Sequence, residues 1–161
     1  MTRARASPSL GKRPRSPVAH ISIQGARRFP GLPAPATLRR WTSLALEGDA
    51  RLTLRFVATP EGRRLNRSYR GKDYATNVLT FDYGAPEGAA VLADIVLCVP
   101  VLRREARAQR KPLRAHLAHL LIHGVLHAQG YDHDKESAAR VMETREIELL
   151  ARLGWPNPYA A

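Results

Sequence analysis

The sequence predicts a single α/β or α+β domain, and three observations support this fold class. Apolar periodicity alternates between strand and helix along most of the chain, and prolines and glycines separate the segments. The 161 residues, 44% hydrophobic and 25% charged, match the composition of a soluble globular protein. A chain of this length can bury one sizeable core without disulfides. We find no internal repeat or linker, and expect residues 17–161 to form one domain.

Four segments carry the pattern of β-strands. The alternation of apolar and polar residues is loose in the first segment and clear in the second, and the last two are mainly apolar runs. The expected strands cover 18–24, 52–58, 78–83 and 91–99. The glycine-containing segment 84–88 separates the last two strands as a turn, so we expect them to pair antiparallel.

Five segments carry helical periodicity. The expected helices cover 36–46, 60–69, 100–110, 113–129 and 135–153. Pro60, Pro100 and Pro112 stand at the starts of the second, third and fourth helices, where a missing backbone N–H costs little. Gly154 stands where the last helix is expected to stop. Helices in this number, mixed with four strands, predict helices packed on a sheet.

Positive charge is concentrated in the first half of the chain. The net charge is +12, and residues 1–72 hold 16 of the 26 Lys and Arg but three of the 14 Asp and Glu. Because arginine pairs with phosphate in two-point contacts, a polyanion such as nucleic acid is a candidate partner; a compositional bias of the genome toward arginine is the alternative.

Residues 1–16 hold five cations and no acid, and we expect them to form a disordered basic tail. This tail is either a phosphate-attracting arm or an idle extension. A transit peptide is a further alternative, but the segment lacks an amphipathic apolar face.

The single cysteine and the absence of long apolar runs indicate a cytoplasmic location. Cys98 lies in the apolar run 95–99, where a buried reduced thiol is the ordinary interpretation. No stretch approaches the roughly 18 apolar residues that a membrane-spanning helix needs, and the N-terminus lacks the apolar segment of a secretory signal. We therefore expect no membrane partner.

The most informative residues are three histidines near the end of a predicted helix. His123 and His127 are four residues apart, so both project from one helix face. Gly130 lets the chain stop and reverse, which directs His133 toward the same point. Three imidazoles predict a divalent metal with a fourth position open to water, as in catalytic zinc sites. A structural zinc would normally add a cysteine, and Cys98 lies in a predicted buried strand.

Polar residues beside the three histidines are candidates to support the metal ligands. His116 and His119 continue the histidine stripe on the same helix face, and we expect them to line the cleft or to hydrogen-bond to a ligand. Asp132 and Asp134 flank the third histidine, and either could accept the hydrogen bond that a metal-bound imidazole donates. Solvated turn residues are the alternative for both aspartates.

Position 124 distinguishes two classes of zinc enzyme. The histidine spacing is similar to that of zinc proteases in which a glutamate follows the first histidine and acts as general base. Gly124 occupies that position here. A protease would therefore lack the group that activates the metal-bound water, so the sequence disfavours peptide hydrolysis.

The same segments resemble the YbeY family of bacterial and organellar endoribonucleases. Residues 123–133 read His-Gly-x-Leu-His-x-x-Gly-Tyr-Asp-His, and 65–81 resemble the family block Asn-x-x-Tyr-Arg-x-Lys-Asp followed by Pro-Thr-Asn-Val-Leu-Ser-Phe. The likeness covers roughly residues 18–159. Ala75, Thr80 and Ala93 depart from the family pattern, and none of them is a predicted ligand.

The resemblance implies a small mixed four-stranded sheet with about five helices and one Zn²⁺ held by His123, His127 and His133. It implies a cationic cleft in which Arg70 is the functional arginine. The basic segment 63–72 also contains Arg67 and Lys72, which we expect to contact RNA, and a solvated helix face is the alternative for Arg67.

The implied activity is that of a zinc-dependent endoribonuclease specific for single-stranded RNA. It would act in 3′-end maturation of 16S ribosomal RNA and in ribosome quality control, with the ribosome or its proteins as partners. A metal ion and a guanidinium both stabilise the charge that develops on an attacked phosphodiester, so the chemistry agrees. Two alternatives remain: an RNA- or ribosome-binding assembly factor with a structural metal, and a metalloprotease.

Overall fold

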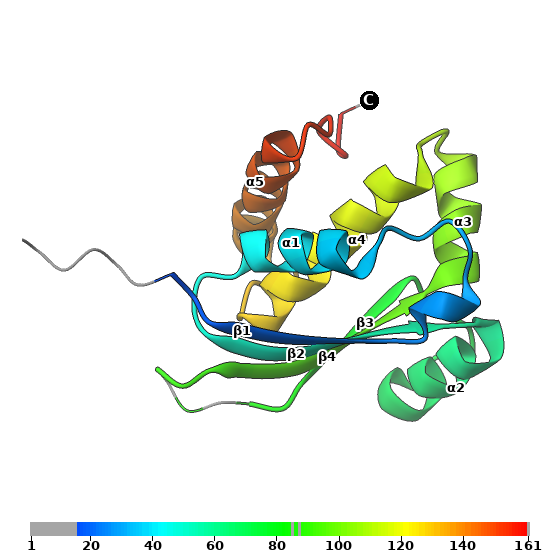
Figure 1. The fold of residues 1–161 in the computed structure, drawn as a ribbon, viewed down its shortest axis with the longest axis horizontal. Coiled ribbons are helices and arrows are strands. Elements are labelled where there is room, and N and C mark those ends of the chain that lie inside the picture. The colour runs from blue at the N-terminus through cyan, green and yellow to red at the C-terminus, as the bar shows by residue number, and fades with distance from the viewer. Residues whose placement is uncertain (1–15, 85, 87, 161) are drawn as a thin grey trace, which may run out of the picture.

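The computed structural model describes residues 16–84, 86 and 88–160, so the predicted basic tail lies almost wholly outside the described residues. The described chain is an α+β domain with a four-stranded mixed sheet, which confirms the expected fold class (Figure 1). In chain order the elements are β1 (Ala19–Gln24), a short 3-10 helix (Ala26–Arg28), α1 (Pro35–Ala45), β2 (Ala50–Val57), α2 (Thr59–Arg70), β3 (Val78–Asp82), β4 (Val91–Cys98), α3 (Val99–Ala108), α4 (Leu113–Ala128) and α5 (Glu136–Arg152).

Each predicted strand and helix is present, with ends within two residues of the expected ones. Pro35, Pro60 and Pro100 occupy the first turns of α1, α2 and α3. Gly154 follows α5 with φ 84°, a left-handed conformation that stops a helix at low cost. The short 3-10 helix after β1 was not predicted.

The sheet has the order β1-β2-β4-β3. β1, β2 and β4 run parallel, and β3 runs antiparallel to β4, which confirms the predicted antiparallel pair. β3 therefore lies at the edge of the sheet although it precedes β4 in the chain. Thr80 of β3 pairs with Ile95 of β4, so both side chains face the same side of the sheet.

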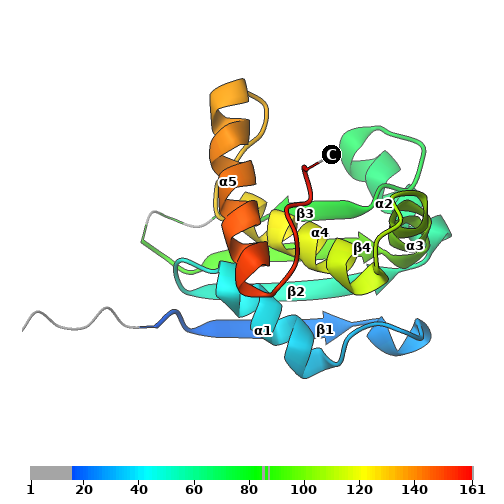
Figure 2. The same cartoon turned by 90° about the horizontal axis from the view of Figure 1, so that it is seen from above.

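One face of the sheet carries the main core. α1, α4 and α5 cover this face, with α4 against the strands (Figures 1 and 2). α4 has apolar residues around its whole circumference, as a helix buried between a sheet and other helices requires. The histidine stripe is thus attached to the most enclosed helix of the domain.

α2 packs on the opposite face of the sheet, over a smaller apolar cluster. This cluster includes Val96 and Cys98 of β4, whose side chains alternate with those in the main core. A Cβ at Gly62 would lie 3.1 Å from the Cys98 sulfur, so glycine allows α2 to approach the strand closely. Among the described residues, no helix has both the length and the apolar character needed to cross a membrane.

Candidate metal centre and cleft

A cleft of about 520 Å³ lies between α4 and the edge strand β3. The end of α2, the loop after α4 and the C-terminal segment complete its walls. The cleft gathers most of the polar residues that the sequence singled out, namely Arg70, His119, His123, His127, Asp132, His133 and Asp134. Segments separated by more than 60 residues in the sequence therefore meet at one site.

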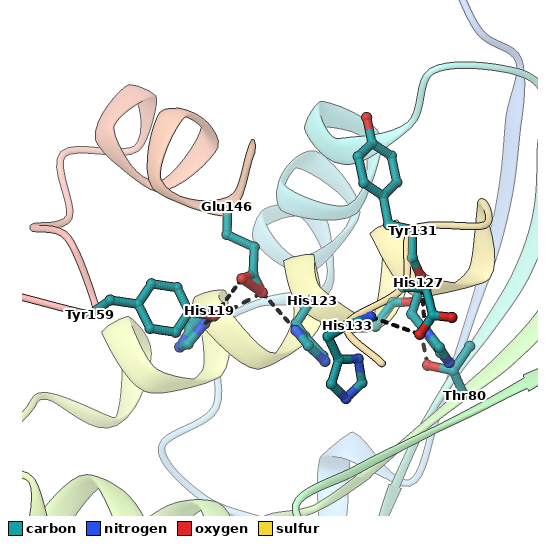
Figure 3. Close-up of polar contacts among 10 residues, drawn as sticks. Thr80, His119, His123, His127, Tyr131, His133, Glu146 and Tyr159 are labelled. Carbon is teal, nitrogen blue, oxygen red and sulfur yellow. Dashed lines mark hydrogen bonds and ion pairs between the residues drawn. The ribbon is translucent and has the colours of Figure 1, made fainter. Parts of the chain in front are cut away.

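The three predicted metal ligands all line the cleft, and the His133 ring lies near each of the other two. The ring centre of His133 is 5.4 Å from that of His123 and 5.9 Å from that of His127. Gly130 has φ 100°, a conformation that residues with a Cβ rarely adopt, and it turns the chain between α4 and His133. Figure 3 shows the His133 ring beside that of His123.

Hydrogen bonds fix two of these rings through the same nitrogen. Nδ1 of His123 lies 2.6 Å from a carboxylate oxygen of Glu146, and Nδ1 of His127 lies 2.9 Å from the Tyr131 carbonyl oxygen. An imidazole that donates from Nδ1 keeps the Nε2 lone pair for a metal, so these bonds select the tautomer that a ligand needs.

Asp132 is close enough to belong to the donor set. One nitrogen each from His127 and His133 and one Asp132 oxygen all lie within 4.8 Å of one another. The Asp132 carboxylate accepts backbone N–H bonds from His133 at 2.7 Å and Asp134 at 3.2 Å, which lower its pKa. The structure therefore places Asp132 as a carboxylate that shapes the His133 loop. Imidazole and carboxylate donors together fit a divalent ion of the zinc type.

Glu146 of α5 is the buried centre of a network behind the ligands (Figure 3). Its carboxylate is fully buried and accepts hydrogen bonds from His123 and, at 2.5 Å, from the Tyr159 hydroxyl. His119 Nε2 lies 3.5 Å from the same carboxylate and 3.2 Å from the Tyr159 oxygen. Burial would raise the pKa of Glu146, but the bonds from His119, His123 and Tyr159 outweigh it and lower the pKa to about 2.

Glu146 and Tyr159 belong to the site although no sequence motif predicts either of them. A signal for Glu146 was present, because it continues the apolar stripe formed by Met142, Leu149 and Leu150 on α5. An acid on a buried stripe needs partners, and those partners identify the site. Tyr159 carries no comparable signal, because its position depends on how the segment after α5 folds back.

His116 does not line the cleft, in contrast to one of the two roles expected for it. Its side chain is buried, and Nε2 lies 3.1 Å from a Glu105 carboxylate oxygen on α3. Glu105 also accepts a hydrogen bond from the Asn77 side chain at 3.1 Å. Because Asn77 lines the cleft at the start of β3, His116 supports the cleft wall from behind.

Of the three basic residues assigned to RNA, Arg70 alone lines the cleft. Arg70 is the last residue of α2, and Gly71 ends the helix with φ 67°. Arg67 lines a separate hollow with Arg63 and Arg64, and Lys72 is exposed beyond the helix end. Arg70 lines the cleft because it is the last residue of α2, where the helix end meets the cleft, whereas Arg67 lies about one turn earlier along the helix.

Gly124 faces the sheet. A Cβ at this position would lie 3.0 Å from Ile95 Cγ2 and 3.3 Å from Thr80 Oγ1. The Thr80 hydroxyl also donates to the Gly124 carbonyl at 3.3 Å, which joins β3 to α4. Packing against the strands therefore accounts for glycine here, and the site has no glutamate at the position where zinc proteases carry their base.

The fold and the site define a class: a small α+β domain with a histidine cluster suited to a divalent metal and an arginine in the same cleft. The chain belongs to the YbeY family, because the family model described as "Endoribonuclease YbeY" matches residues 36–154. The resemblance recognised in the motifs is therefore confirmed.

Relatives and a solved structure agree with this assignment. "Endoribonuclease YbeY" of Aromatoleum aromaticum is 58% identical over 136 residues, which cover 84% of this chain and 87% of that protein. The protein of the same name from Cupriavidus pinatubonensis is 54% identical over 146 residues, covering 89% and 73%. The solution structure of TM1509 from Thermotoga maritima has a TM-score of 0.54 at 23% identity, covers 88% of this chain and 99% of that one, and supports the fold.

Proposed function

We propose that the chain is a zinc-dependent endoribonuclease that cleaves single-stranded RNA during 16S ribosomal RNA maturation and ribosome quality control. The main supporting observation is that one cleft contains both the histidine cluster and Arg70. Membership in a family named for endoribonucleases supports the same reaction. Ribosomes or ribosomal proteins are the proposed partners.

In this proposal His123, His127 and His133 hold the ion. A bound divalent metal would supply Lewis-acid stabilisation of the charge that develops on the phosphodiester oxygens. Arg70 binds the phosphate and donates its planar fork of N–H groups to the same oxygens. Glu146 acts as a positioning residue, because its bond to Nδ1 holds the His123 ring in one orientation.

Exposed aromatic residues support a preference for unpaired RNA. Tyr69 lines the cleft and is 63% exposed, and Tyr74 is 55% exposed, so neither side chain belongs to the core. The Tyr69 ring packs edge-on against Phe81 with centroids 4.0 Å apart, so its position is fixed while much of its surface stays open. A fixed aromatic surface stacks on unpaired bases, which a duplex does not present.

We also propose a cytoplasmic location. Cys98 is 1% exposed, and burial raises the pKa of its thiol. A protonated, enclosed thiol fits a protein that remains in a reducing compartment beside its RNA substrate.

The test compares metal-loaded and metal-stripped protein on single-stranded and double-stranded RNA of the same sequence. We expect cleavage of the single strand by the loaded protein, loss on stripping and recovery with Zn²⁺. His127→Ala should lose both metal and cleavage, whereas His20→Ala, an exposed histidine on β1, should retain both. Cleavage of peptides without cleavage of RNA would contradict the proposal.

A further inference from the structure

A second hollow, of about 350 Å³, lies beside the metal cleft and is lined by Trp155, Pro156, Pro158, Arg110, Lys111 and His119, among others. We propose that this hollow, called here the flanking groove, binds one unpaired nucleotide of the RNA next to the cleaved segment. The base would lie against the tryptophan and prolines, and its phosphate against the two cations. This inference rests on the proposed function and extends it to a part of the substrate outside the cleft.

The flanking groove is adjacent to the cleft. His119 lines both cavities, and the chain passes from Pro158 in the groove to Tyr159 in the cleft. The rings of His119 and Tyr159 are 5.3 Å apart and form the boundary between the two spaces. Figure 2 shows the C-terminal segment passing over α4.

The two cavities also share one floor. Ala115 lines the flanking groove and His123 lines the cleft, both on α4. Eight residues of helix separate them, which corresponds to about 12 Å along the axis. An RNA strand that is bound at the metal cleft and runs along α4 would therefore reach the flanking groove within this distance.

The surface of the flanking groove suits a nucleobase. Leu150, Trp155 and Pro156 contribute apolar surface, and the indole and pyrrolidine rings are rigid. Flat and rigid apolar side chains stack on bases with little loss of conformational entropy, and every base offers a face for such contact. The groove therefore predicts binding of a base with little dependence on its identity.

Two cations, Arg110 and Lys111, line the flanking groove, and both belong to a basic segment of the chain. Residues 103–114 contain six Lys and Arg and a single acid, Glu105. The Glu105 carboxylate is occupied by the side chains of Asn77 and His116. This charge excess favours a polyanion over a neutral proline-rich peptide as the occupant.

Arg110 carries the most specific part of this argument. It follows α3 with φ 54°, and it is the one residue other than glycine with positive φ in the described part of the chain. The Lys111 N–H bonds to the Ala106 carbonyl at 2.9 Å, as in helix ends that usually place glycine at this position. A side chain is strained there, and this one lies at the rim of the groove.

The unusual backbone of Arg110 permits a test that separates binding from folding. Arg110→Gly removes the cation but relaxes the backbone, so the variant should be at least as thermostable as the wild type and should retain its metal content. Cleavage is measured on single-stranded RNAs with one cleavable linkage, the other linkages blocked by 2′-O-methyl groups, lengthened one nucleotide at a time at either end. For the wild type we expect kcat/KM to rise about tenfold when one particular nucleotide is added.

In Arg110→Gly this rise should shrink severalfold, while the shortest cleaved RNA should be processed at the wild-type rate. An abasic nucleotide at the critical position should remove the rise in the wild type. Arg140→Ala, which removes a cation paired with Glu136 on α5, serves as the charge-matched control and should retain the whole rise. The slope of log affinity against log salt should become shallower by about 0.7 in Arg110→Gly alone.

Binding gives a readout that does not depend on cleavage. Trp41 is 2% exposed, so a short oligouridylate should change the fluorescence of Trp155 and not that of Trp41. Trp155→Phe removes the reporting indole, so loss of the change in this variant assigns the signal to Trp155 and not to Trp41. If the wild type cleaves RNA but Arg110→Gly and Trp155→Phe match its kcat/KM at every RNA length, the flanking groove does not bind RNA. If the wild type cleaves no RNA, the proposed function fails instead.

Discussion

Hydrogen bonds to single side chains organise the candidate metal centre. The buried Glu146 carboxylate holds His123, and the Tyr131 carbonyl holds His127, each through Nδ1. These contacts orient the rings through Nδ1 and leave Nε2 of each ring for a metal. Ligand geometry therefore depends on residues that would not touch the metal.

Glu146→Gln should weaken metal binding by about 10- to 100-fold, because the amide removes the negative charge that orients His123 and makes it a stronger ligand. A competition titration against a chelator measures the affinity. Glu148→Gln, on the same helix with an exposed side chain paired to Arg145, is the matched control and should bind metal like the wild type. Equal affinities in both variants would show that the Glu146 contact does not support the site.

Arg70→Gln should reduce cleavage of single-stranded RNA by about 100-fold or more while metal content stays unchanged, because a charged donor to the phosphate is lost. Arg70→Lys should recover little, since an ammonium lacks the planar fork. Arg70→Glu should be inactive. Arg140→Gln controls for the change in net charge, and a normal rate for Arg70→Gln would exclude the role assigned to this arginine.

The sequence identified the residues of the site better than their partners. His123, His127 and His133 follow from local spacing, because a helix and a glycine turn determine where they project. Glu146 reaches His123 across 23 residues, and this contact depends on how α5 packs beside α4. Such a contact has no local signature other than an acid on an apolar stripe.

Among the elements, α4 combines the centre of the core with the site. Gly124 lies where α4 crosses β3 and β4, and its carbonyl accepts a hydrogen bond from Thr80. This close contact sets the distance between the histidine stripe and the strand that forms the opposite wall of the cleft. A change in helix-to-sheet spacing should therefore alter the cleft as well as the stability.

Gly124→Ala should lower the free energy of unfolding by about 1 kcal/mol. A better helix former contributes about 1 kcal/mol in favour, but the methyl group meets Ile95 at 3.0 Å in a tightly packed core, which costs about 1 to 3 kcal/mol. Denaturant titration measures the difference. The loss of stability caused by Gly124→Ala should be smaller in an Ile95→Ala background. If Gly124→Ala alone were more stable than the wild type, the strands would accommodate the methyl group at little cost.

Element boundaries were predicted well because their signals are local. Prolines mark the starts of α2 and α3, and the turn after β3 predicted the antiparallel pair. The sheet order was not predictable in this way. β4 pairs with β2 across the intervening α2 and β3, and α2 packs on the face opposite α4, both of which depend on long-range packing.

Across the whole molecule, positive charge is arranged more widely than the sequence analysis indicated. The net positive charge comes from residues 1–72. Residues 103–114 nevertheless form a second basic segment, whose positive charge is balanced by acidic residues elsewhere in the second half of the chain. The cleft and the flanking groove lie between Arg70 and this segment. A polyanionic strand can therefore meet cations at both ends of the site.

Deletion of residues 1–16 should leave the melting temperature and metal content unchanged, because the start of β1 is held by the Val18 N–H bond to Asp49 at 2.8 Å. RNA affinity should fall, and its salt dependence should become shallower by at most about 3.5 for five lost cations. Affinity measured across a salt series tests this. A lower melting temperature would place the tail inside the domain, and unchanged affinity would make it an idle extension.

The position of Gly130 has a consequence for how fast a bound ion would exchange. His123 and His127 are carried by α4, whose enclosed amides should exchange hydrogen only on global opening, whereas His133 lies on an exposed loop. One ligand can thus withdraw by a local excursion while the other two stay in place. A chelator should then extract the ion from the native protein at a rate independent of global stability. Substitutions at the Gly130 hinge should change that rate, whereas substitutions in the core should not.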